Sequence, residues 1–548
     1  MSVANQSLQT PPWWRGAVIY QIYPRSFFDA NGDGIGDLPG ILAKLDYVKA
    51  LGVDALWISP FFRSPMKDYG YDVSDYRTVD PMFGSNADFD QIIEAAHQRG
   101  LKVMVDMVLA HTSDQHPWFQ ESRQSRTNPK ADWYVWADPK PDGTPPNNWM
   151  AVFGGPSWKW ESRRRQYYLH HFLEAQPNLN WHNPQVIDAM LGEVEFWLER
   201  GVDGLRLDAI VTLLHDPELR DNPPASEISG EGMTSRDMPH THQQHLYDRD
   251  HPDIMKRFAQ LRALVNRYPD RFLLGEIAEC ADSIDVAARY SQGEEALHTS
   301  YTFQMIKDQF GVEQLRAVIG RFESEIGTGW ATHAFGNHDS KRVVSRWEVL
   351  PRLGRDRKAL AKLLMACLLS LRGSICVYQG EELGLTEADL PLEAMRDPFG
   401  IEFYPMFKGR DGCRTPMPWT DDPERGGFTT STPWLPIWHE HLELCVERQK
   451  ADPASVLNAY RRFLAWRKQH PALISGDKIL MDTPDPIYAF ERRHADERLL
   501  CVFNFSNMPA SMKVAEGWQA LAGHGFEVTY DGQTLSLPPF GVFFGTAG

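Results

Sequence analysis

Short apolar segments recur along the chain at intervals that leave room for one helix between neighbours, and this alternation restricts the fold more than any other feature. The segments are Val18–Pro24, Ala55–Pro60, Lys102–Val108, Gly204–Ile210, Arg271–Ile277, Ser300–Phe303, Ala331–Asp339 and Ser374–Gly380. Eight strand–helix units predict a closed parallel (β/α)8 barrel, the TIM barrel of the α/β class. The alternative is an open doubly wound sheet, which usually has a glycine-rich phosphate turn after its first strand. The sequence contains no GxGxxG motif, which favours the barrel.

Two stretches interrupt this alternation, so we expect the barrel to be built from separate parts of the chain. Residues 112–181 follow the third strand and are rich in Pro, Trp, Asn and Gly, which predicts a small excursion domain over the barrel mouth. The barrel then comprises residues 1–111 and 182–475, with an irregular insertion at about 381–450. Residues 476–548 contain alternating strand-like runs separated by turn residues, which predicts an all-β C-terminal domain.

The bulk properties of the chain exclude several classes of partner. The net charge of the chain is −17, whereas nucleic-acid binding requires a basic surface. The longest apolar stretch, Leu363–Leu371, is too short to cross a bilayer, and the N-terminus lacks the pattern of a secretion signal. The six cysteines are scattered without a CxxC pair, which is typical of reduced thiols. We therefore expect a cytoplasmic protein without nucleic-acid or membrane partners, and the oligomeric state stays open.

Three carboxylic acids stand at the ends of predicted strands, namely Asp208, Glu276 and Asp339. Two histidines, His111 and His338, stand at similar positions. The C-terminal ends of barrel strands meet at one face, so we expect these side chains to converge. Three carboxylates without a neighbouring thiol or phosphate-binding loop indicate cleavage of an acetal, which is the chemistry of glycosidic bonds.

Each of these residues has a possible chemical role and a simpler structural one. Arg206 and Asp208 share one face of a strand, so we expect the guanidinium to lower the pKa of the acid and keep it ionised as a nucleophile. Glu276 could protonate the leaving oxygen. Asp339 and the two histidines could bind hydroxyls of the sugar ring. The structural alternatives are an Arg–Asp pair, a strand-end salt bridge and histidines that are satisfied in the core.

A loop after the first strand is rich in oxygen-bearing side chains. They alternate along the segment DANGDGIGD and are Asp29, Asn31, Asp33 and Asp37. Hard oxygen ligands at this spacing favour Ca²⁺, or Mg²⁺ if waters complete the shell. The twelfth position of an EF-hand loop would be Gly40 instead of an acid, which argues against an EF-hand.

These motifs resemble the α-amylase superfamily and, within it, the α-glucosidase and oligo-1,6-glucosidase group. The resemblance covers nearly the whole chain and includes GYDVSDY, DMVLAH, QPNLNW, GLRLDAI, LLGEI, FGNHD, YQGEELG and GRDGCRTPMPW in the order of the family. It implies a barrel, an excursion domain after the third strand and a β C-terminal domain. It also implies that Asp208 is the nucleophile, Glu276 the general acid/base and Asp339 the transition-state stabiliser.

The same resemblance assigns residues to the pocket of the reacting glucose. An ion pair between Asp68 and Arg414 would close the far end of the pocket, which implies exo action that releases one glucose at a time. Ala209 directly follows the nucleophile. In similar proteins that cut α-1,6 bonds this position is occupied by valine, so the alanine implies an α-1,4 preference. The residues implied to surround the glucose are Asp68, Tyr71, His111, Arg206, Ala209, His338 and Arg414.

The resemblance further implies a structural Ca²⁺ in the DANGDGIGD loop, with the carbonyl of Ile35 as an additional ligand, and no organic cofactor. It implies a covalent glucosyl intermediate, from which water releases glucose and a sugar or alcohol accepts it. A glucosyltransferase or a sucrose-acting relative is therefore an alternative, although no RLDRD-type loop of sucrose isomerases is apparent between Ser300 and Phe335. A remote alternative is a non-catalytic subunit that resembles the heavy chains of amino-acid transporters, which have lost the catalytic acids. The expected partners are small sugar substrates and acceptors.

Overall fold

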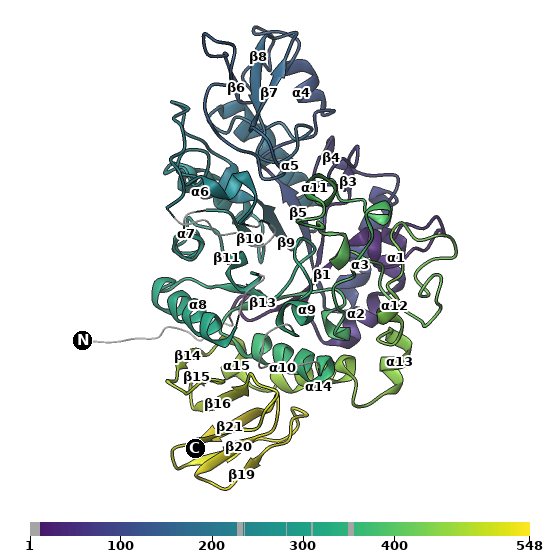
Figure 1. The fold of residues 1–548 in the computed structure, drawn as a ribbon, viewed down its shortest axis with the longest axis vertical. Helices are drawn as coiled ribbons and strands as arrows, with labels where there is room; N and C mark the ends of the chain where they lie inside the picture. Colours follow the sequence, from purple (N-terminus) through teal and green to yellow (C-terminus); the bar gives the residue numbers. More distant parts are fainter. Residues whose placement is uncertain are drawn as a thin grey trace, which may run out of the picture.

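Eight parallel strands form a closed barrel at the centre of the protein (Figure 1). The computed structural model describes residues 11–226, 234, 236–280, 282–307, 311–348 and 356–547. The strands are β1 (Val18–Ile22), β2 (Ala55–Ile58), β5 (Lys102–Val108), β9 (Gly204–Asp208), β10 (Phe272–Ile277), β11 (Thr299–Thr302), β12 (Thr332–Ala334) and β13 (Ser374–Tyr378). Their order is β11-β10-β9-β5-β2-β1-β13-β12, and a parallel bridge between Ser300 and Ala331 joins the two ends of the sheet. Each predicted segment overlaps a barrel strand, so the predicted fold class is confirmed.

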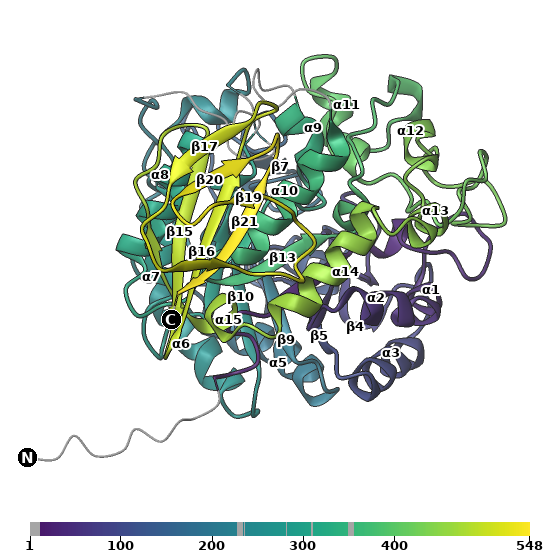
Figure 2. The same ribbon diagram turned by 90° about the horizontal axis from the view of Figure 1, so that it is seen from below.

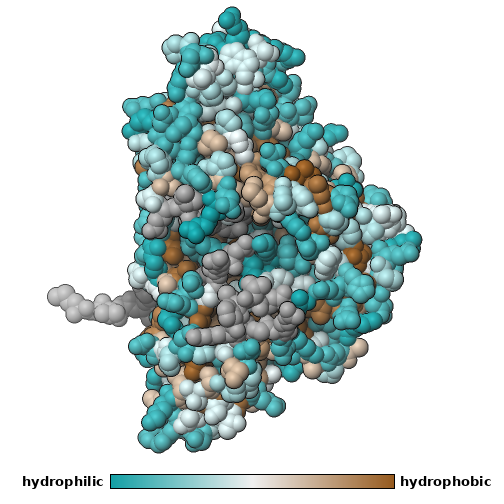
Figure 3. All heavy atoms as spheres, in the orientation of Figure 1, coloured by the Kyte–Doolittle hydropathy of each residue, from teal (hydrophilic) through white to brown (hydrophobic). Residues whose placement is uncertain are grey.

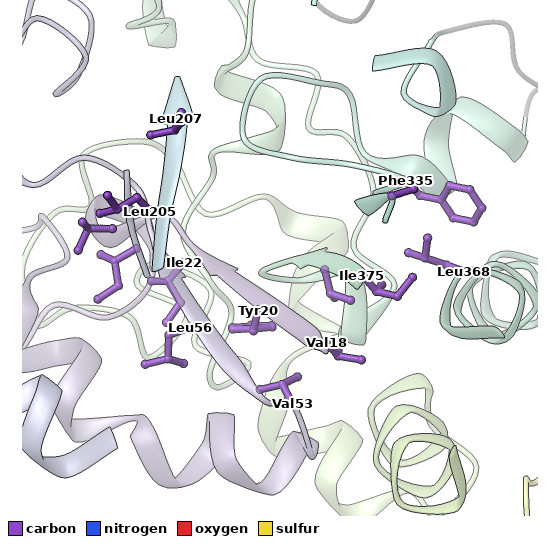
Figure 4. Packing of buried hydrophobic residues seen from close by; sticks show 14 of the residues in the cluster. Val18, Tyr20, Ile22, Val53, Leu56, Leu205, Leu207, Phe335, Leu368 and Ile375 are labelled. Carbon is purple, nitrogen blue, oxygen red and sulfur yellow. The ribbon is translucent and has the colours of Figure 1, made fainter. Parts of the chain in front are cut away.

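The two faces of each barrel strand pack against different partners. Val18, Tyr20 and Ile22 of β1 belong to the large cluster between the barrel and its helices, part of which is drawn in Figure 4. Ile19 of the same strand and Trp57 of β2 lie in a separate cluster inside the barrel. Successive side chains of a strand point to opposite faces. Along each strand, the inward-facing residues beyond this inner cluster therefore lie at the open end of the barrel.

Helices follow the strands and cover the outer face of the barrel (Figure 1). They are α2 (Leu45–Leu51), α3 (Asn86–Gln98), α5 (Pro184–Glu199), α6 (Ile254–Val265), α7 (Ser283–Tyr290), α8 (Val312–Glu325) and α10 (Arg357–Ser370). Local signals fix where they begin. Ser85 and Asp88 form a reciprocal capping box at the start of α3, and Asn183 caps α5 directly before Pro184.

The segment between β5 and α5 forms the excursion, which lies at the top of Figure 1. It contains α4 (Pro117–Ser122) and a small antiparallel sheet of β6 (Trp136–Ala137), β8 (Gln166–Leu169) and β7 (Trp158–Glu161), in that order. A bridge between His111 and Asn178 joins the start of the excursion to its end. The excursion is therefore anchored at the C-terminal end of β5, next to the mouth of the barrel.

A second long connection, residues 209–253 between β9 and α6, was not singled out by the sequence analysis. Its described parts contain only short 3₁₀ turns, η2 (Ile210–Thr212) and η3 (Pro239–His242). Asn148 of the excursion donates a hydrogen bond to the carbonyl of Asn222 in this connection, 2.8 Å away. The two segments therefore pack together, and the mouth of the barrel has two walls where the sequence predicted one.

The predicted irregular insertion after β13 contains only short elements before the barrel closes. These are η5 (Glu381–Leu383), η6 (Leu392–Ala394), α11 (Pro398–Phe403), η7 (Asp411–Cys413), α12 (His439–Leu442) and α13 (Val446–Ala451). Helix α14 (Val456–Arg467) follows and packs against α10 and α2. The segment around η7 carries the GRDGCR motif to the mouth of the barrel, where it meets the loop after β12.

The C-terminal part of the chain folds into antiparallel strands below the barrel (Figures 1 and 2). One sheet has the order β14 (Asp477–Leu480), β15 (Ile487–His494), β16 (Glu497–Asn504), β21 (Val542–Ala547) and β18 (Trp518–Ala520). A smaller sheet contains β17 (Ala510–Lys513), β20 (Thr534–Leu537) and β19 (Thr529–Tyr530). The larger sheet packs on α8, α10 and α15 (Pro471–Ser475), away from the excursion.

The outer surface is mainly polar on the face seen in Figure 3, where hydrophobic residues form small separate groups. Across the described ranges, no helix has both the length and the apolar character needed to cross a membrane.

Candidate active site

Three adjacent strands end in polar side chains that point into the barrel mouth. These side chains are Asp106 on β5, Arg206 and Asp208 on β9, and Glu276 on β10. They continue the inward rows that begin with apolar residues such as Met104 and Leu274, because residues two apart share a face. Asp208 and Glu276 line the same pocket. The convergence predicted from the strand ends is therefore present.

The guanidinium of Arg206 is the centre of this group. Its Nη1 lies 2.7 Å from Oδ1 of Asp106 and 2.7 Å from Oδ1 of Asp208. Its Nη2 lies 2.5 Å from Oε1 of Glu276. The side chain of Arg206 is fully buried, so these contacts act with little screening by water. One guanidinium therefore holds both candidate catalytic carboxylates side by side.

Glu276 has two further donors that fix the orientation of its carboxylate. The hydroxyl of Tyr301 on β11 donates to Oε1 at 2.9 Å, and the backbone amide of Ala209 donates to Oε2 at 3.0 Å. Ala209 has a φ of 41°, in the left-handed region that costs a non-glycine residue about 1 kcal/mol. This turn directs the amide that follows Asp208 toward Glu276. The two acids are thus linked through the main chain as well as through Arg206.

Burial opposes ionisation of Asp208 and Asp106. It raises the pKa of Asp208 well above its ordinary value, although the charge of Arg206 acts in the opposite direction. Burial likewise raises the pKa of Asp106 to about 6 against the effect of Arg206. The expected lowering of the pKa of Asp208 is therefore wrong, because removal of the carboxyl from water outweighs its one positive neighbour.

Asp339 lies in the loop after β12 and has a different electrostatic environment. Its Oδ1 accepts hydrogen bonds from Arg414 at 2.6 Å and from Arg410 at 3.2 Å. Burial raises the pKa of Asp339, but the positive charges of Arg410 and Arg414 oppose it, and the pKa lies below its ordinary value. Asp339 is therefore an ionised acceptor at neutral pH, as a residue that binds sugar hydroxyls must be.

His338 supports the pocket from behind and does not line it. Its Nδ1 accepts a hydrogen bond from Nε2 of Gln21 at 2.7 Å, and its Nε2 lies 2.5 Å from the hydroxyl of Tyr71. The two rings stack with centroids 5.3 Å apart and an interplanar angle of 6°. Burial lowers the pKa of His338 well below its ordinary value, so the imidazole is neutral. His338 thus positions Tyr71, which lines the pocket.

The predicted ion pair between Asp68 and Arg414 is not the pair that the structure forms. Oδ1 of Asp68 lies 2.8 Å from Nη2 of Arg410, four residues earlier in the chain. Arg414 instead donates through Nε to the carbonyl of His338 at 2.7 Å and through Nη2 to Asp339. The η7 turn separates the two arginines, so that Arg410 lines the pocket while Arg414 lies behind it.

The predicted site residues divide into two groups by their position relative to the pocket. Those that line the pocket are Asp68, Tyr71, His111, Asp208, Ala209, Glu276 and Asp339. Arg206, His338 and Arg414 are buried behind them. His111 has an Nδ1 atom with no hydrogen-bond partner in the part of the chain that the structure covers. Burial lowers the pKa of His111 to about 3, so the imidazole is neutral at neutral pH.

The structure adds site residues that the sequence analysis missed. They are Asp106, Tyr301 and Arg410 in the contacts described above, Gln176, Phe153 and Phe172 from the excursion, and Arg249 and Glu279 near Glu276. Asp106 was detectable, because it is a single acid in the apolar strand KVMVDMV and shares a face with Met104. The excursion residues lie in irregular backbone, where no periodicity indicates direction.

The predicted metal loop is folded around its own acidic side chains. Asp29 accepts hydrogen bonds from the amides of Gly32 at 2.7 Å and Gly34 at 2.8 Å. Asp37 accepts a hydrogen bond from the amide of Gly40 at 2.6 Å and caps the start of α1 (Leu38–Ala43). Within the described ranges, no three His, Cys, Asp or Glu side chains are grouped to hold a metal ion. Each carboxylate oxygen can accept more than one partner, so the donor chemistry remains suited to Ca²⁺.

The chain is similar to known proteins over nearly its whole length. The profile of the alpha amylase catalytic domain matches residues 21–476, and that of the maltogenic amylase C-terminal domain matches residues 479–544. A protein described as a probable alpha-glucosidase from Rhizobium meliloti is 50% identical over 549 residues, which cover 99% of each chain. An oligo-1,6-glucosidase from Heyndrickxia coagulans is 38% identical, with 93% of this chain and 96% of that protein covered.

The fold is also similar to solved structures over nearly its full length. The crystal structure of an alpha-glucosyl transfer enzyme superposes with a TM-score of 0.96 and 52% identity, and covers 98% of this chain and 100% of that chain. The trehalulose synthase of Pseudomonas mesoacidophila superposes with a TM-score of 0.89 and 33% identity over 98% of this chain and 100% of that one.

Proposed function

The chain belongs to the α-amylase family of glycoside hydrolases, and from this membership and the pocket geometry we propose that it is a retaining, exo-acting α-glucosidase. The observation that carries the proposal is the shared guanidinium of Arg206, which holds Asp208 and Glu276 side by side. Retaining enzymes place their two carboxyl groups about 5–5.5 Å apart, whereas inverting enzymes leave a wider gap for water. A single bridging side chain supports the shorter spacing.

The first half of the reaction forms a covalent intermediate. An oxygen of Asp208 attacks C1 of the glucose and forms an ester bond, while the bond between C1 and the leaving oxygen breaks. Glu276 transfers its proton to that oxygen, so the leaving group departs as a neutral alcohol. Arg206 supplies the positive charge that favours the ionised form of Asp208 against the effect of burial.

The second half reverses these roles. Glu276, now a carboxylate, takes a proton from water as the water oxygen bonds to C1 and the ester to Asp208 breaks. The product is α-glucose, because two displacements at C1 restore the original configuration. Asp339 is ionised beside the pocket and accepts hydroxyl hydrogen bonds that strengthen as the ring flattens.

The ion pair between Asp68 and Arg410 supports exo action. The pair of Asp68 and Arg410 presents charged donors and acceptors to the non-reducing hydroxyls of one glucose. A chain that continued beyond this glucose would have to displace the pair. We therefore expect glucose to be released singly from maltose, short oligosaccharides and other α-glucosides.

Trapping of the intermediate tests the mechanism. A 2-deoxy-2-fluoro glucoside with a good leaving group should label the peptide that contains Asp208, and NMR should detect α-glucose as the first product. Asp208→Asn should abolish hydrolysis of p-nitrophenyl α-glucoside. A label on another peptide, or β-glucose as the first product, would contradict the proposal. Inactivity of the unchanged protein toward every α-glucoside would favour a non-catalytic subunit.

The same intermediate supports a second activity, transfer of glucose to a sugar or an alcohol. The observation that favours it is the similarity to the alpha-glucosyl transfer enzyme at 52% identity. Incubation with maltose and an added alcohol separates the two outcomes. Alkyl glucoside in excess over the glucose released by water means transfer, and free glucose alone means hydrolysis.

We also propose that the loop of residues 29–37 binds a structural Ca²⁺ and that no organic cofactor is needed. The ligands would be the side chains of Asp29, Asn31, Asp33 and Asp37 with the carbonyl of Ile35. The support is the concentration of hard oxygen donors in one loop. The ion would stabilise the loop, and no step of the reaction passes through it.

A further inference from the structure

A second group of pocket residues comes from the loops that follow β9 and β10. The connection between β9 and α6 and the loop after β10 contribute Ala209, Val211, Thr212, Arg249, Ala278 and Glu279. Ala278 and Glu279 directly follow the strand that carries the proposed acid/base Glu276. The part of the pocket that they line is therefore next to the oxygen that Glu276 protonates, where the leaving group or the acceptor has to lie.

Arg249 is the charged donor of this group. Its side chain is 98% buried, and its Nη1 donates to the carbonyl of Glu279 at 2.8 Å. In the described residues, neither Nε nor Nη2 of Arg249 has a hydrogen-bond partner, and Nε lies 3.9 Å from Oδ2 of Asp248. A buried donor without a partner costs free energy that a bound ligand can recover. Arg249 therefore has hydrogen-bonding capacity that the folded chain does not use.

The guanidinium is held in place by an unusual backbone turn. Glu279 has a φ of 56°, in the left-handed region that non-glycine residues rarely adopt. Its carboxylate accepts a hydrogen bond from Thr234 at 2.8 Å, and Oε2 lies 3.6 Å from Nε2 of His240. These contacts anchor the residue whose carbonyl receives Arg249. The guanidinium of Arg249 is thus held in a fixed position.

The charges around Arg249 decide what kind of ligand it suits. The carboxylates of Asp248 and Glu279 both lie near its guanidinium, and the proposed catalytic acids add more negative charge to the pocket. Asp248 also accepts hydrogen bonds from His245 at 2.8 Å and Asn222 at 2.9 Å, which favour its ionised form. An anionic ligand such as a sugar phosphate would be repelled by these carboxylates. A neutral hydroxyl can accept from Arg249 without this cost.

We propose that Arg249 is a specificity residue of the leaving-group and acceptor subsite, where it donates a hydrogen bond to a hydroxyl oxygen of a neutral polyhydroxy group. The inference rests on the proposed α-glucosidase function and adds the chemistry of the group on the other side of the scissile bond. The apolar side chains of Val211 and Ala278 lie beside the polar contact. The preferred partners are neutral sugars and polyols.

The test compares two substrates that differ only in the leaving group. The leaving group of maltose is a glucose unit that would contact Arg249. The leaving group of α-glucosyl fluoride is fluoride, which carries no hydroxyl. Arg249→Met removes the donors and keeps a long side chain, and Arg249→Lys restores one charged donor. Arg220→Met is the matched control, because Arg220 belongs to the same connection and its side chain is 54% exposed. Thermal melting checks that each variant is folded.

We expect Arg249→Met to lower kcat/KM for maltose by about 10- to 100-fold, the range of a hydrogen bond from a charged donor. The loss for α-glucosyl fluoride should stay within about twofold, and Arg249→Lys should recover part of the activity on maltose. In transfer from α-glucosyl fluoride, the unchanged protein should prefer glycerol to glycerol phosphate, and Arg249→Met should lower the yield of glucosyl glycerol relative to glucose.

Three results would overturn the assignment of Arg249. Equal losses on maltose and α-glucosyl fluoride would mean that Arg249 only supports the fold or the catalytic acids, and a preference for glycerol phosphate would mean an anion site. Unchanged kinetics on maltose would also refute it. If the unchanged protein failed to hydrolyse α-glucosyl fluoride at all, the proposed α-glucosidase function would fail together with the subsite.

Discussion

Asp68 and Arg410 form a buried ion pair at the pocket, with Oδ1 and Nη2 2.8 Å apart and both side chains at most 5% exposed. Arg410 also contacts Asp397 at 2.7 Å and Asp339 at 3.2 Å, so a single arginine connects the end of the pocket to the proposed transition-state stabiliser. Removal of one partner of such a pair leaves an uncompensated buried charge. The direct partner of Asp68 is therefore Arg410, whereas Arg414 makes its hydrogen bonds to Asp339 and to the carbonyl of His338.

A double-mutant cycle tests which arginine is paired with Asp68. We expect Asp68→Asn and Arg410→Gln each to lower kcat/KM for maltose, and the double variant to lose much less than the product of the two losses. The coupling should be about 1–3 kcal/mol, the range for residues in direct contact. The control cycle uses Arg414→Gln, which should couple less strongly to Asp68→Asn. A larger coupling with Arg414 would mean that the pair predicted from the sequence forms when sugar is bound.

The difference between Arg410 and Arg414 shows where sequence reasoning reaches its limit. Strands have a fixed period of two, so Arg206 and Asp208 could be placed on one face and their contact could be predicted. The two arginines lie on either side of the short turn η7, where no period indicates which side chain enters the pocket. The family resemblance supplied a residue, but the three-dimensional turn decides the contact.

The same reasoning explains the other site residues. Asp208 and Glu276 could be found because each ends an apolar strand, and Asp106 would have followed from the same alternation. The environment of Asp208 could not be predicted, because the pKa depends on burial by segments far away in the sequence. Arg249 lies in the connection between β9 and α6 and Glu279 in the loop after β10, and neither backbone carries a repeating pattern.

The residue after the proposed nucleophile should control linkage preference. Ala209 lines the pocket beside Glu276, and its small side chain leaves space for the group that follows the glucose. We expect the unchanged protein to hydrolyse maltose faster than isomaltose, and Ala209→Val to lower the ratio of the two kcat/KM values by about 10-fold, or roughly 1.4 kcal/mol.

A second property of Ala209 provides the control. Its φ of 41° is costly for a β-branched residue, so Ala209→Val should also lower thermal stability, while Ala209→Gly should relieve the strain. If Ala209→Gly changes the preference as much as Ala209→Val does, backbone strain instead of side-chain size determines the linkage. Equal rates of the unchanged protein on maltose and isomaltose would refute the α-1,4 preference itself.

Calcium should stabilise the loop of residues 29–37. Removal of divalent ions with EDTA should lower the Tm by several degrees, because an ion that binds only the folded state shifts unfolding by mass action. Added Ca²⁺ should restore the Tm more fully than Mg²⁺. In Asp33→Ala, which removes an exposed carboxylate of the loop, the response to Ca²⁺ should disappear, whereas Asp142→Ala in an exposed turn should retain it. An unchanged Tm after EDTA would mean that the loop needs no metal.

Glu381 should make the stability of the protein depend on pH. It begins η5 behind the loop that carries Asp339, and its Oε1 has no hydrogen-bond partner in the described ranges. Burial raises its pKa from the ordinary 4.5 to about 8, against the effects of Arg342 and Arg346. Between these values the folded protein retains a proton that the unfolded chain has released, so unfolding becomes easier as the pH rises. The proton on Glu381 contributes its full stabilisation of the folded state below about pH 4.5, and this stabilisation is lost between that pH and about pH 8. Above about pH 8 the free energy of unfolding no longer changes through Glu381, and the total span is at most about 5 kcal/mol.

Glu381→Gln isolates this effect, because the amide keeps the shape of the protonated acid and cannot lose a proton. We expect the Tm of the unchanged protein to fall more between pH 5 and about pH 8 than the Tm of Glu381→Gln, so that the variant is the more stable protein at the higher pH. Glu382→Gln is the control, since the carboxylate of Glu382 accepts hydrogen bonds from Tyr20 and Tyr47 and the variant should lose stability. Parallel Tm curves for the unchanged protein and Glu381→Gln would show that Glu381 is ionised in the folded state and that its charge is balanced by the two arginines.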